Sequence, residues 1–438
     1  MEREGWGRWA PLAYLLIAVP VMLFVALAAP PFQGADEDNH FLRVIALSRG
    51  EVVGTRFSDF SAGGFVNRTA VAAAHALDRL KFHPERHVTA AELLAVRGLR
   101  WRGAVGAADF GNTALYPPWF YGPAVVAVLI ARAGRMPVVD GLLLARVLTG
   151  LAGAGVGALA IGMARRGRAI VFGGLALPMS LALLGSCSQD GLLIATAALA
   201  AALLGRGRHG WAGLLLGLVV AARPPYAPLL LLLGLGWPGR RALAVAVLAA
   251  ALPLLWIAFG AAPAEIALRP ADGVSIAGQL RGLLAHPARV PGIAMRTLVQ
   301  SGAGYWRELL GVLGWLDTPL AGAAYRIADA MLAAALAVQL AGPGEARPRW
   351  VGAAVGLVIL AAMGAVFAAQ YLSWTPVGAA RVEGVQGRYL IPVLLFLGLA
   401  LPGFGRLSWA RAGWAWLYAA AAASWWFVPM AIMARYYG

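Results

Sequence analysis

Roughly eleven apolar runs follow one another along this chain, most of them near the 20 or so residues that a helix needs to cross the core of a bilayer. A run such as 242–260 is apolar on every side, whereas the strands of a transmembrane β-barrel alternate apolar and polar residues. Hydrophobic residues make up 61% of the chain and charged residues 13%, which excludes an ordinary soluble enzyme. We therefore predict an all-α, polytopic transmembrane protein of about 11 spans, forming one integral-membrane domain over residues 1–438.

The formal net charge is +16, and most basic residues lie in loops between the apolar runs. Cytoplasmic loops of membrane proteins carry an excess of Arg and Lys. Membrane orientation thus accounts for the charge, and nucleic acid is not expected as a partner. The single cysteine, Cys187, excludes an intrachain disulfide and a cysteine-based metal cluster.

One apolar stretch, residues 119–133, leaves the topology open because it is short for a span. If it crossed the membrane, Arg165, Arg166 and Arg168 would face outside; if it lies flat on the surface, they face the cytoplasm. The flat arrangement also places the later basic pairs inside, namely Arg206 and Arg208, Arg240 and Arg241, Arg347 and Arg349, and Arg406 and Arg411. The predicted spans are then 10–29, 141–163, 169–185, 190–204, 210–222, 226–238, 242–260, 320–341, 350–371, 389–404 and 413–431.

This topology predicts two long external loops, residues 30–140 with juxtamembrane helices and residues 261–318. Every unusual polar cluster then falls on the outer side. The positions predicted to be external are Gly50, Gly191, Gly273 and Val377, and those predicted to be internal are Gly167, Gly207, Gly239 and Gly344.

An acidic cluster follows the first apolar run, within residues 30–41 (PPFQGADEDNHF). Asp36, Glu37, Asp38 and His40 are groups that bind a divalent cation or take a proton from a hydroxyl. The alternative is structural, because acids such as Asp36 or Asp38 commonly cap the start of a helix.

Two arginines at predicted external helix ends are candidate anion ligands. Arg388 lies at the entrance of the tenth run, beside Gln386 and Tyr389, where it serves either as a phosphate ligand or as an interfacial anchor. Arg223 interrupts an apolar stretch, so it either binds a phosphate or extends to the surface. Asp190 either lines the same cavity or caps the fourth run.

Several motifs resemble those of a bacterial family of polytopic membrane proteins catalogued only as a domain of unknown function. They are the opening at 31–41, the YPP sequence at 116–118, SQD at 188–190, GWLDTPL at 314–320 and GVQGRYLIP at 384–392. That family resembles a branch of the GT-C superfamily, whose integral-membrane glycosyltransferases take a sugar from a polyprenyl-phosphate carrier on the outer face of the membrane.

The resemblance implies an inverting glycosyltransferase of the bacterial cytoplasmic membrane, with its active site facing the exterior and a cell-envelope glycan or glycolipid as acceptor. Asp36 then takes the place of the general base with Glu37 beside it, and Asp38-Asn39, where the family commonly has a proline, leaves open which acid acts. Arg223 and Arg388 would hold the donor phosphate, while His40, Tyr116, Asp190, Gln386 and Tyr389 would contact substrate.

No cofactor is implied, except a divalent cation if the acidic cluster binds one. The alternative from another class is a transporter or flippase of a lipid-linked sugar or another anionic lipid, with acids that couple to protons. A third interpretation, an envelope scaffold, leaves Arg223 without a purpose. A transporter predicts polar residues inside the spans and access from both sides, whereas the polar clusters here gather on one face.

Overall fold

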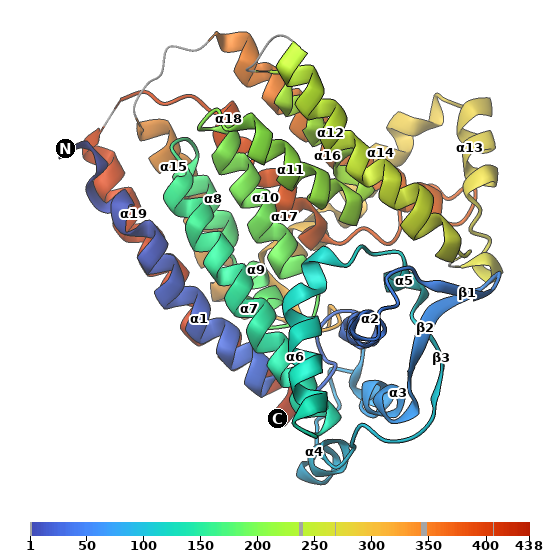
Figure 1. Ribbon diagram of the computed structural model, residues 1–438. Helices are drawn as coiled ribbons and strands as arrows, with labels where there is room; N and C mark the ends of the chain where they lie inside the picture. The colour runs from blue at the N-terminus through green and yellow to red at the C-terminus, as the bar shows by residue number, and fades with distance from the viewer. Residues whose placement is uncertain (1, 236–239, 268, 343–347, 406) are drawn as a thin grey trace.

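In the computed structural model, the chain forms a bundle of helices with a smaller part attached at one end (Figure 1). The structure describes residues 2–235, 240–267, 269–342, 348–405 and 407–438. Within these ranges, six helical segments are long and apolar enough to cross a membrane: Trp6–Ala28, Val138–Met163, Arg240–Ala264, Gly322–Ala341, Trp350–Ser373 and Arg411–Tyr437. The predicted class, a polytopic helical membrane protein, is confirmed.

These six segments contain the long elements of the bundle. In chain order they are η1 (Glu2–Trp9) with α1 (Ala10–Ala28), α7 (Val138–Met163), α12 (Arg240–Trp256) with η5 (Ile257–Ala261) and η6 (Ala262–Ala264), α15 (Gly322–Ala341), α16 (Arg349–Ser373), and α19 (Leu407–Ala422) with α20 (Ser424–Tyr437).

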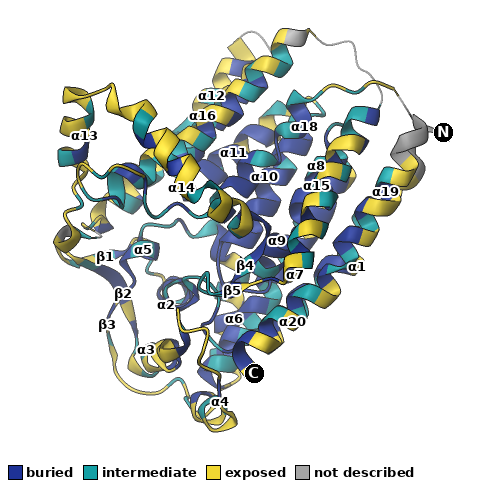
Figure 2. Ribbon diagram, turned by 180° about the vertical axis from the view of Figure 1, so that it is seen from behind, coloured by how far each residue is buried: buried dark blue, intermediate teal, exposed yellow. Residues whose placement is uncertain are grey.

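The other five predicted spans are shorter or broken. They are α8 (Arg168–Leu175) with α9 (Pro178–Leu184), α10 (Asp190–Leu204), α11 (His209–Ala222), η4 (Pro224–Leu233), and η8 (Gly387–Leu390) with α17 (Ile391–Leu394) and α18 (Leu397–Ala400). A helix of 15 residues such as α10 extends about 22 Å, less than the roughly 30 Å of a bilayer core. α10 is instead buried along nearly its whole length inside the bundle (Figure 2).

The ambiguous stretch contains η3 (Trp119–Tyr121) and α6 (Gly122–Ala133), a helix of 12 residues that is too short to span. α6 packs beside the first part of α7 as a helical hairpin (Figure 1), and its position relative to the membrane surface stays a prediction. Ala124, Ala127 and Ala131 are buried, and Ala131 lies against Gly141 of α7. These small side chains permit the close approach of α6 and α7.

The segment from residue 30 to 137, here called the α2–α6 region, has its own hydrophobic core. Its elements before α6 are α2 (Glu37–Ser48), β1 (Thr55–Ser58), β2 (Ser61–Asn67), α3 (Arg68–His75), η2 (Asp78–Leu80), α4 (Ala90–Arg97), β3 (Val105–Asp109) and α5 (Gly111–Ala114). The strands form a small antiparallel sheet in the order β1-β2-β3, which was not predicted. Phe41, Leu42, Val44 and Ile45 of α2 are fully buried and form the centre of this core.

The second long loop folds mainly into helices, with η7 (Pro270–Asp272), α13 (Ile276–Ala285) and α14 (Arg289–Gly311). A hairpin of β4 (Val312–Leu313) and β5 (Thr318–Pro319) follows α14. Gly314 and Leu316 have φ values of 62° and 61° in its tight turn. The hairpin therefore belongs to the GWLDTPL motif.

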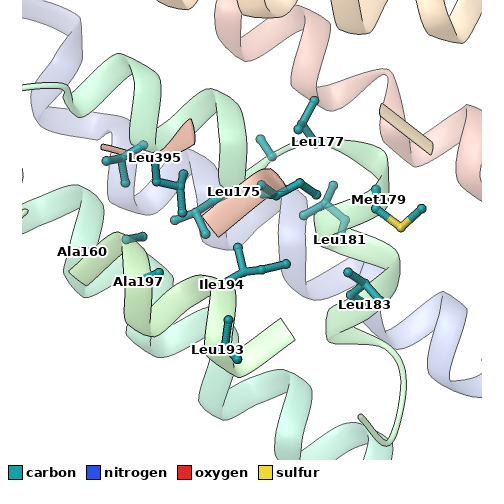
Figure 3. Packing of buried hydrophobic residues seen from close by; sticks show 14 of the residues in the cluster. Ala160, Leu175, Leu177, Met179, Leu181, Leu183, Leu193, Ile194, Ala197 and Leu395 are labelled. Carbon is teal, nitrogen blue, oxygen red and sulfur yellow. The ribbon is translucent and has the colours of Figure 1, made fainter. Parts of the chain in front are cut away.

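The larger hydrophobic core joins the bundle helices. Figure 3 shows side chains from α7, α8, α9, α10 and residue 395 directed toward one another, including Leu175, Leu181 and Ile194. By contrast, α12 and α16 present exposed apolar residues on their outer faces (Figure 2), such as Leu248 and Leu357. Such faces suit contact with lipid chains.

The two ends of the bundle differ in composition. At one end, Arg168 donates to the carbonyl oxygens of Ala164 and Gly7, and Arg206 donates to that of Met163. At the other end lie the acidic cluster, Asp190, Arg223 and Arg388. The basic residues and the acidic cluster thus lie at opposite ends of the bundle, which agrees with the predicted alternation of internal and external loops. Which end faces the cytoplasm stays a prediction. The predictions for Gly239, Gly344, Arg347 and Arg406 lie outside the described residues.

Candidate functional site

The acidic cluster begins α2, and its side chains point to different partners. Asp36 is the N-cap residue of α2 with φ 55°, yet its carboxylate makes no capping hydrogen bond. Its Oδ2 accepts from Nη2 of Arg388 at 3.0 Å, and its Oδ1 accepts from Asn112 at 3.4 Å. With 31% of its side chain exposed, Asp36 keeps accessible lone pairs. The capping interpretation therefore fails for this carboxylate.

Glu37 is completely buried and turned toward α7. Arg146 of α7 donates to both carboxylate oxygens, at 2.8 and 2.6 Å, and the amides of Cys187 and Gly34 also donate to them. Burial would raise the pKa of Glu37, but the Arg146 charge and these hydrogen bonds outweigh burial and lower it. All four lone-pair positions of the Glu37 carboxylate are thus occupied, so of the two neighbouring acids only Asp36 is open to a further partner.

Arg146 completes this buried pair with the end of α1. Its guanidinium also donates to the carbonyl oxygens of Ala26, Ala29 and Pro30, at 3.0, 2.8 and 3.0 Å. These carbonyls belong to the last turn of α1 and the residues after it, where no further helical donors follow. The Glu37–Arg146 pair therefore joins α1, α2 and α7 and fixes the direction in which the chain leaves the bundle.

The side chains of Asp38 and His40 also bond to partners within the protein. Lys81 Nζ lies 2.6 Å from Asp38 Oδ2, and burial raises the pKa of Asp38 although Lys81 opposes this effect. His40 Nδ1 is 2.6 Å from the Tyr121 hydroxyl, and burial lowers the pKa of His40 to about 4, which keeps the ring neutral.

Asp36, Glu37, Asp38 and His40, the candidate cation ligands, point toward separate partners and do not converge on one point. A different trio, Asp38, His75 and Asp78, has one ligand atom from each residue within 4.8 Å of the others. Lys81 already bonds Asp38 and Asp78 there, so a protein ammonium group supplies the positive charge.

Arg223 and Arg388 both approach one carboxylate of the protein, that of Asp190. Nη2 of Arg223 lies 2.9 Å from Oδ1 of Asp190, and Nε of Arg388 lies 3.8 Å from Oδ2. Asp190 begins α10, yet its carboxylate pairs with the arginines instead of capping the helix. Because Arg388 also pairs with Asp36, two cations and two carboxylates form one network, with Arg388 at its centre.

Aromatic rings enclose the network on the Arg223 side. The Arg223 guanidinium lies between the rings of Tyr116 and Tyr389, 5.1 and 5.0 Å from their centroids. Tyr116 also stacks on His40, with centroids 5.9 Å apart. These contacts favour a desolvated cation held in one orientation. The predicted substrate contacts Tyr116, Tyr389 and His40 thus meet around Arg223, which does not extend to the surface.

Several buried polar atoms near the network make no hydrogen bond within the described residues. They are Nε of Arg388, Oδ1 of Asn112, Oε1 of Gln386, and both Nε2 and Oε1 of Gln189. Gln189 is 0% exposed and precedes Asp190 in the chain. Buried polar groups are normally paired, and a group left unpaired costs about 1–3 kcal/mol. These atoms are free to bond to a ligand or to water.

The GVQGRYLIP motif positions Arg388 through backbone contacts. The amide of Gly387 donates to Glu308 of α14 at 2.7 Å. A Cβ at Gly387 would lie 1.9 Å from the carbonyl oxygen of Tyr305, so only glycine fits. The close approach to α14 therefore sets the direction of the neighbouring arginine.

The GWLDTPL motif has a structural role of the same kind. Asp317 accepts from Arg435 of α20 at 2.7 Å, and the indole of Trp315 donates to the carbonyl oxygen of Phe32 at 3.2 Å. The hairpin thus ties the last helix to the residues just before Asp36.

Sequence reasoning missed several residues of this region. Arg146 could have been found by the rule that selected Arg223, since it too is a charge in an apolar helix. Lys81, Asn112 and Tyr121 carried no local signal, because only the fold brings them to α2.

The fold and the site define a polytopic helical membrane protein with a buried ion network at one end of its bundle. The sequence model of the family described as Predicted membrane protein (DUF2142) matches residues 20–397, and the chain belongs to this family. No curated protein and no solved structure matches it.

Proposed function

We propose that this protein is a membrane glycosyltransferase of the GT-C type, which moves a sugar from a polyprenyl-phosphate donor to an envelope glycan or glycolipid outside the cytoplasmic membrane. The observation that carries the proposal is the network itself, in which one accessible carboxylate, Asp36, contacts Arg388, and Asp190 links Arg388 to Arg223. Glycosyl transfer from a lipid phosphate needs these two kinds of group side by side.

In the proposed step, Asp36 takes the proton of an acceptor hydroxyl. The hydroxyl oxygen then forms a bond to the anomeric carbon while the bond from that carbon to the phosphate oxygen breaks. The electron pair of the broken bond leaves with the polyprenyl phosphate, and Arg223 and Arg388 stabilise its charge. Attack on the side opposite the phosphate inverts the anomeric configuration.

The charges of the network allow a donor phosphate to replace the carboxylates as partners of the arginines. Before the donor binds, Asp36 and Asp190 neutralise the arginines. A phosphate would offer Arg388 Nε the hydrogen-bond partner that it lacks in the described structure. It would also free Asp36 from its ion pair, which makes the carboxylate available as a base.

A reconstitution experiment tests the proposal whichever sugar the donor carries. The purified protein in liposomes is supplied with a panel of polyprenyl-phosphate sugars and envelope glycolipid extract, and released polyprenyl phosphate is measured. Asp36→Asn should lower release by roughly 10²- to 10⁴-fold, the usual contribution of a general base. Asp59→Asn, a matched change at an exposed acid, should leave release unchanged.

The asparagine variant should fold, since Asn also tolerates the left-handed backbone that Asp36 adopts. Lipid-linked sugar that moves between leaflets without release of polyprenyl phosphate would instead support a flippase. Equal release by the wild type and the Asp36→Asn variant would remove Asp36 from the mechanism. Mass spectrometry of envelope glycans from a deletion strain would identify the product.

A further inference from the structure

Two helices of the second long loop, α13 and α14, leave a large apolar surface uncovered. α13 projects beyond the bundle helices, and exposed residues follow the visible face of α14 (Figure 2). α14 has 23 residues, enough to cross a bilayer core, but it is too polar to be one of the six candidate spans. A long amphipathic helix of this kind is typical of a membrane surface.

The exposed apolar residues of α14 share one face. They are Met295, Leu298, Val299 and Trp306, and Val299 is 75% exposed. Their spacings of 3, 4, 7 and 8 residues bring side chains to one side of a helix with 3.6 residues per turn. The face is therefore continuous along two to three turns of α14.

α13 extends this apolar surface toward α16. Ile276, Leu280 and Leu284 recur every fourth residue and are exposed, with Leu284 at 80%. On its other side α13 is attached to the end of α16, because the buried Gln279 donates to the carbonyl oxygen of Tyr371 at 3.0 Å. The uncovered surface thus continues from a helix whose own exposed residues suit contact with lipid.

The inner face of α14 is bonded to the segment that leads to Arg388. The hydroxyl oxygen of Thr297 accepts from the amide of Val382 at 2.9 Å, and Glu308 accepts from the amide of Gly387 at 2.7 Å. These contacts fix the rotation of α14 about its axis. The apolar face consequently stays outside, where it loses contact with water only if another molecule covers it.

Arginines follow one border of the apolar face. Arg289, Arg296 and Arg307 are spaced by 7 and 11 residues, which on an α-helix returns each to within about 20° of the one before. Glu308 is the one acid in residues 276–311, against four arginines, and its carboxylate is bonded to Gly387. The two helices therefore carry a net positive charge beside their apolar surface.

Trp306 adds a feature of membrane interfaces. Its ring is partly exposed on the apolar face, while its indole N–H donates to Asp329 of α15 at 2.8 Å. Tryptophan is enriched at the level of lipid head groups, where one end of the side chain is apolar and the other is polar.

We infer that α13 and α14 form a lipid-binding surface that lies in the interface of an anionic bilayer. The apolar face enters the region of the acyl chains, and the arginine stripe binds phosphate groups of anionic phospholipids. The inference goes beyond the proposed function and does not depend on it.

Spin labels on introduced cysteines test the contact with lipid. The full chain in nanodiscs is labelled at Leu298→Cys or Gln300→Cys, and the accessibility of each label to oxygen and to a water-soluble nickel chelate is measured. Gln300 is exposed too but lies beyond the arginine stripe, so it is the matched control on the same helix. The ratio of oxygen to nickel accessibility should be at least about fivefold higher at 298 than at 300.

Two reference positions give the limits of this scale. Leu357→Cys on α16 should behave as a lipid-exposed site and Asp59→Cys as a water-exposed site. A label at 298 as accessible to the nickel chelate as the one at 59 would overturn the inference. A label at 298 protected from both agents would overturn it as well, since a protein would then cover α14.

Photolabelling identifies the lipid. The nanodiscs contain equal parts of phosphatidylglycerol and phosphatidylcholine, one of which bears a diazirine, and labelled peptides are mapped by mass spectrometry. Labels from phosphatidylglycerol within residues 276–311 should exceed those from phosphatidylcholine at least about fivefold, roughly the preference that one arginine near an anionic surface provides. Equal labelling by the two lipids would overturn the assignment of an anionic ligand.

A double variant connects this preference to the arginine stripe. Arg289→Gln with Arg307→Gln should reduce the preference to about twofold or less, whereas Arg296 is kept because it also donates to the carbonyl oxygen of Ala380. Arg56→Gln with Arg102→Gln, at exposed arginines of the α2–α6 region, should retain the wild-type preference. A preference unchanged by the α14 double variant would refute the role of the stripe. None of these measurements requires sugar transfer, so their failure leaves the proposed function untouched.

Discussion

Arg388 contacts Asp36 across 352 positions of the chain, with its Nη2 3.0 Å from Oδ2 of the carboxylate. The same guanidinium is 3.8 Å from Asp190, which in turn pairs with Arg223. Arg388 therefore joins the proposed base to the proposed phosphate site. A ligand that changes the position of Arg388 necessarily changes the environment of Asp36.

Arg388→Lys should keep the positive charge and lose the planar fork that contacts two carboxylates. A charged hydrogen bond contributes about 1.5–3 kcal/mol, so we expect release of polyprenyl phosphate to fall by roughly 10- to 100-fold. Arg326→Lys, the same change at an exposed arginine, is the control. Unchanged release in the Arg388→Lys variant would show that charge alone suffices at this position.

Glu37→Gln should act on stability and not primarily on chemistry. The substitution leaves Arg146 buried without its counter-charge, and such losses cost about 3–5 kcal/mol. We expect a lower unfolding midpoint for this variant in detergent, whereas Asp36→Asn should unfold close to the wild type. A stable but inactive Glu37→Gln variant would return Glu37 to the catalytic site.

The contrast between these neighbours shows what the sequence can establish. Apolar runs and charge placement predicted a helical membrane protein. The motifs selected Asp36, Asp190 and Arg388, and a charge inside an apolar stretch selected Arg223, and the fold brings these four residues together. The sequence did not distinguish Asp36 from Glu37, because that difference depends on Arg146, more than a hundred positions away. Partners of this kind are set by helix packing, which leaves no local pattern.

The same limit applies to the span lengths and to the small sheet. α10 has only 15 residues and is enclosed by other helices, and enclosure is a property of the whole bundle and not of the residues of α10. In β2, the buried Ala62, Gly63 and Gly64 lack the large apolar residues that normally indicate a strand. Its pairing with β3 became visible only in the fold.

His40 should make stability depend on pH. Its pKa is lowered by burial from 6.5 to about 4, so between these values the unfolded chain binds more protons than the folded one. Stability is thus complete above about pH 6.5 and falls, by up to about 3 kcal/mol, as the pH drops toward 4.

Unfolding midpoints of the wild type and His40→Gln between pH 4.5 and 7 would measure this dependence. Glutamine still offers Tyr121 a hydrogen-bond partner but does not titrate, so the variant should show a flatter pH profile. His83→Gln, at an exposed histidine, should retain the wild-type profile. A profile unchanged by His40→Gln would assign the acid sensitivity to other groups.

The orientation in the membrane can be measured with introduced cysteines. Asp59 is exposed in the α2–α6 region and Arg208 is exposed at the other end of the bundle. We expect Asp59→Cys to react with an impermeant maleimide in intact cells, and Arg208→Cys only after the membrane is opened. Cys187 is 1% exposed and should give little background. The reverse pattern would invert the predicted topology.

Asp190→Asn should strengthen the binding of phosphate. In the structure Asp190 occupies the position between the arginines where an anion would bind, so the donor must compete with this carboxylate. Removing its charge leaves two cations that repel each other unless an anion lies between them. A charge interaction of about 1.4 kcal/mol at a partly screened site corresponds to a tenfold change in affinity.

We therefore expect Asp190→Asn to bind a short-chain polyprenyl phosphate about tenfold more tightly than the wild type, as measured by competition with a fluorescent analogue. Turnover should fall, because the product phosphate leaves more slowly. The same substitution in the Arg223→Gln background should have a smaller effect, since one of the two cations is then absent. Weaker binding by Asp190→Asn would show instead that this carboxylate is needed to hold the arginines in place for the phosphate, and the competition argument would be wrong.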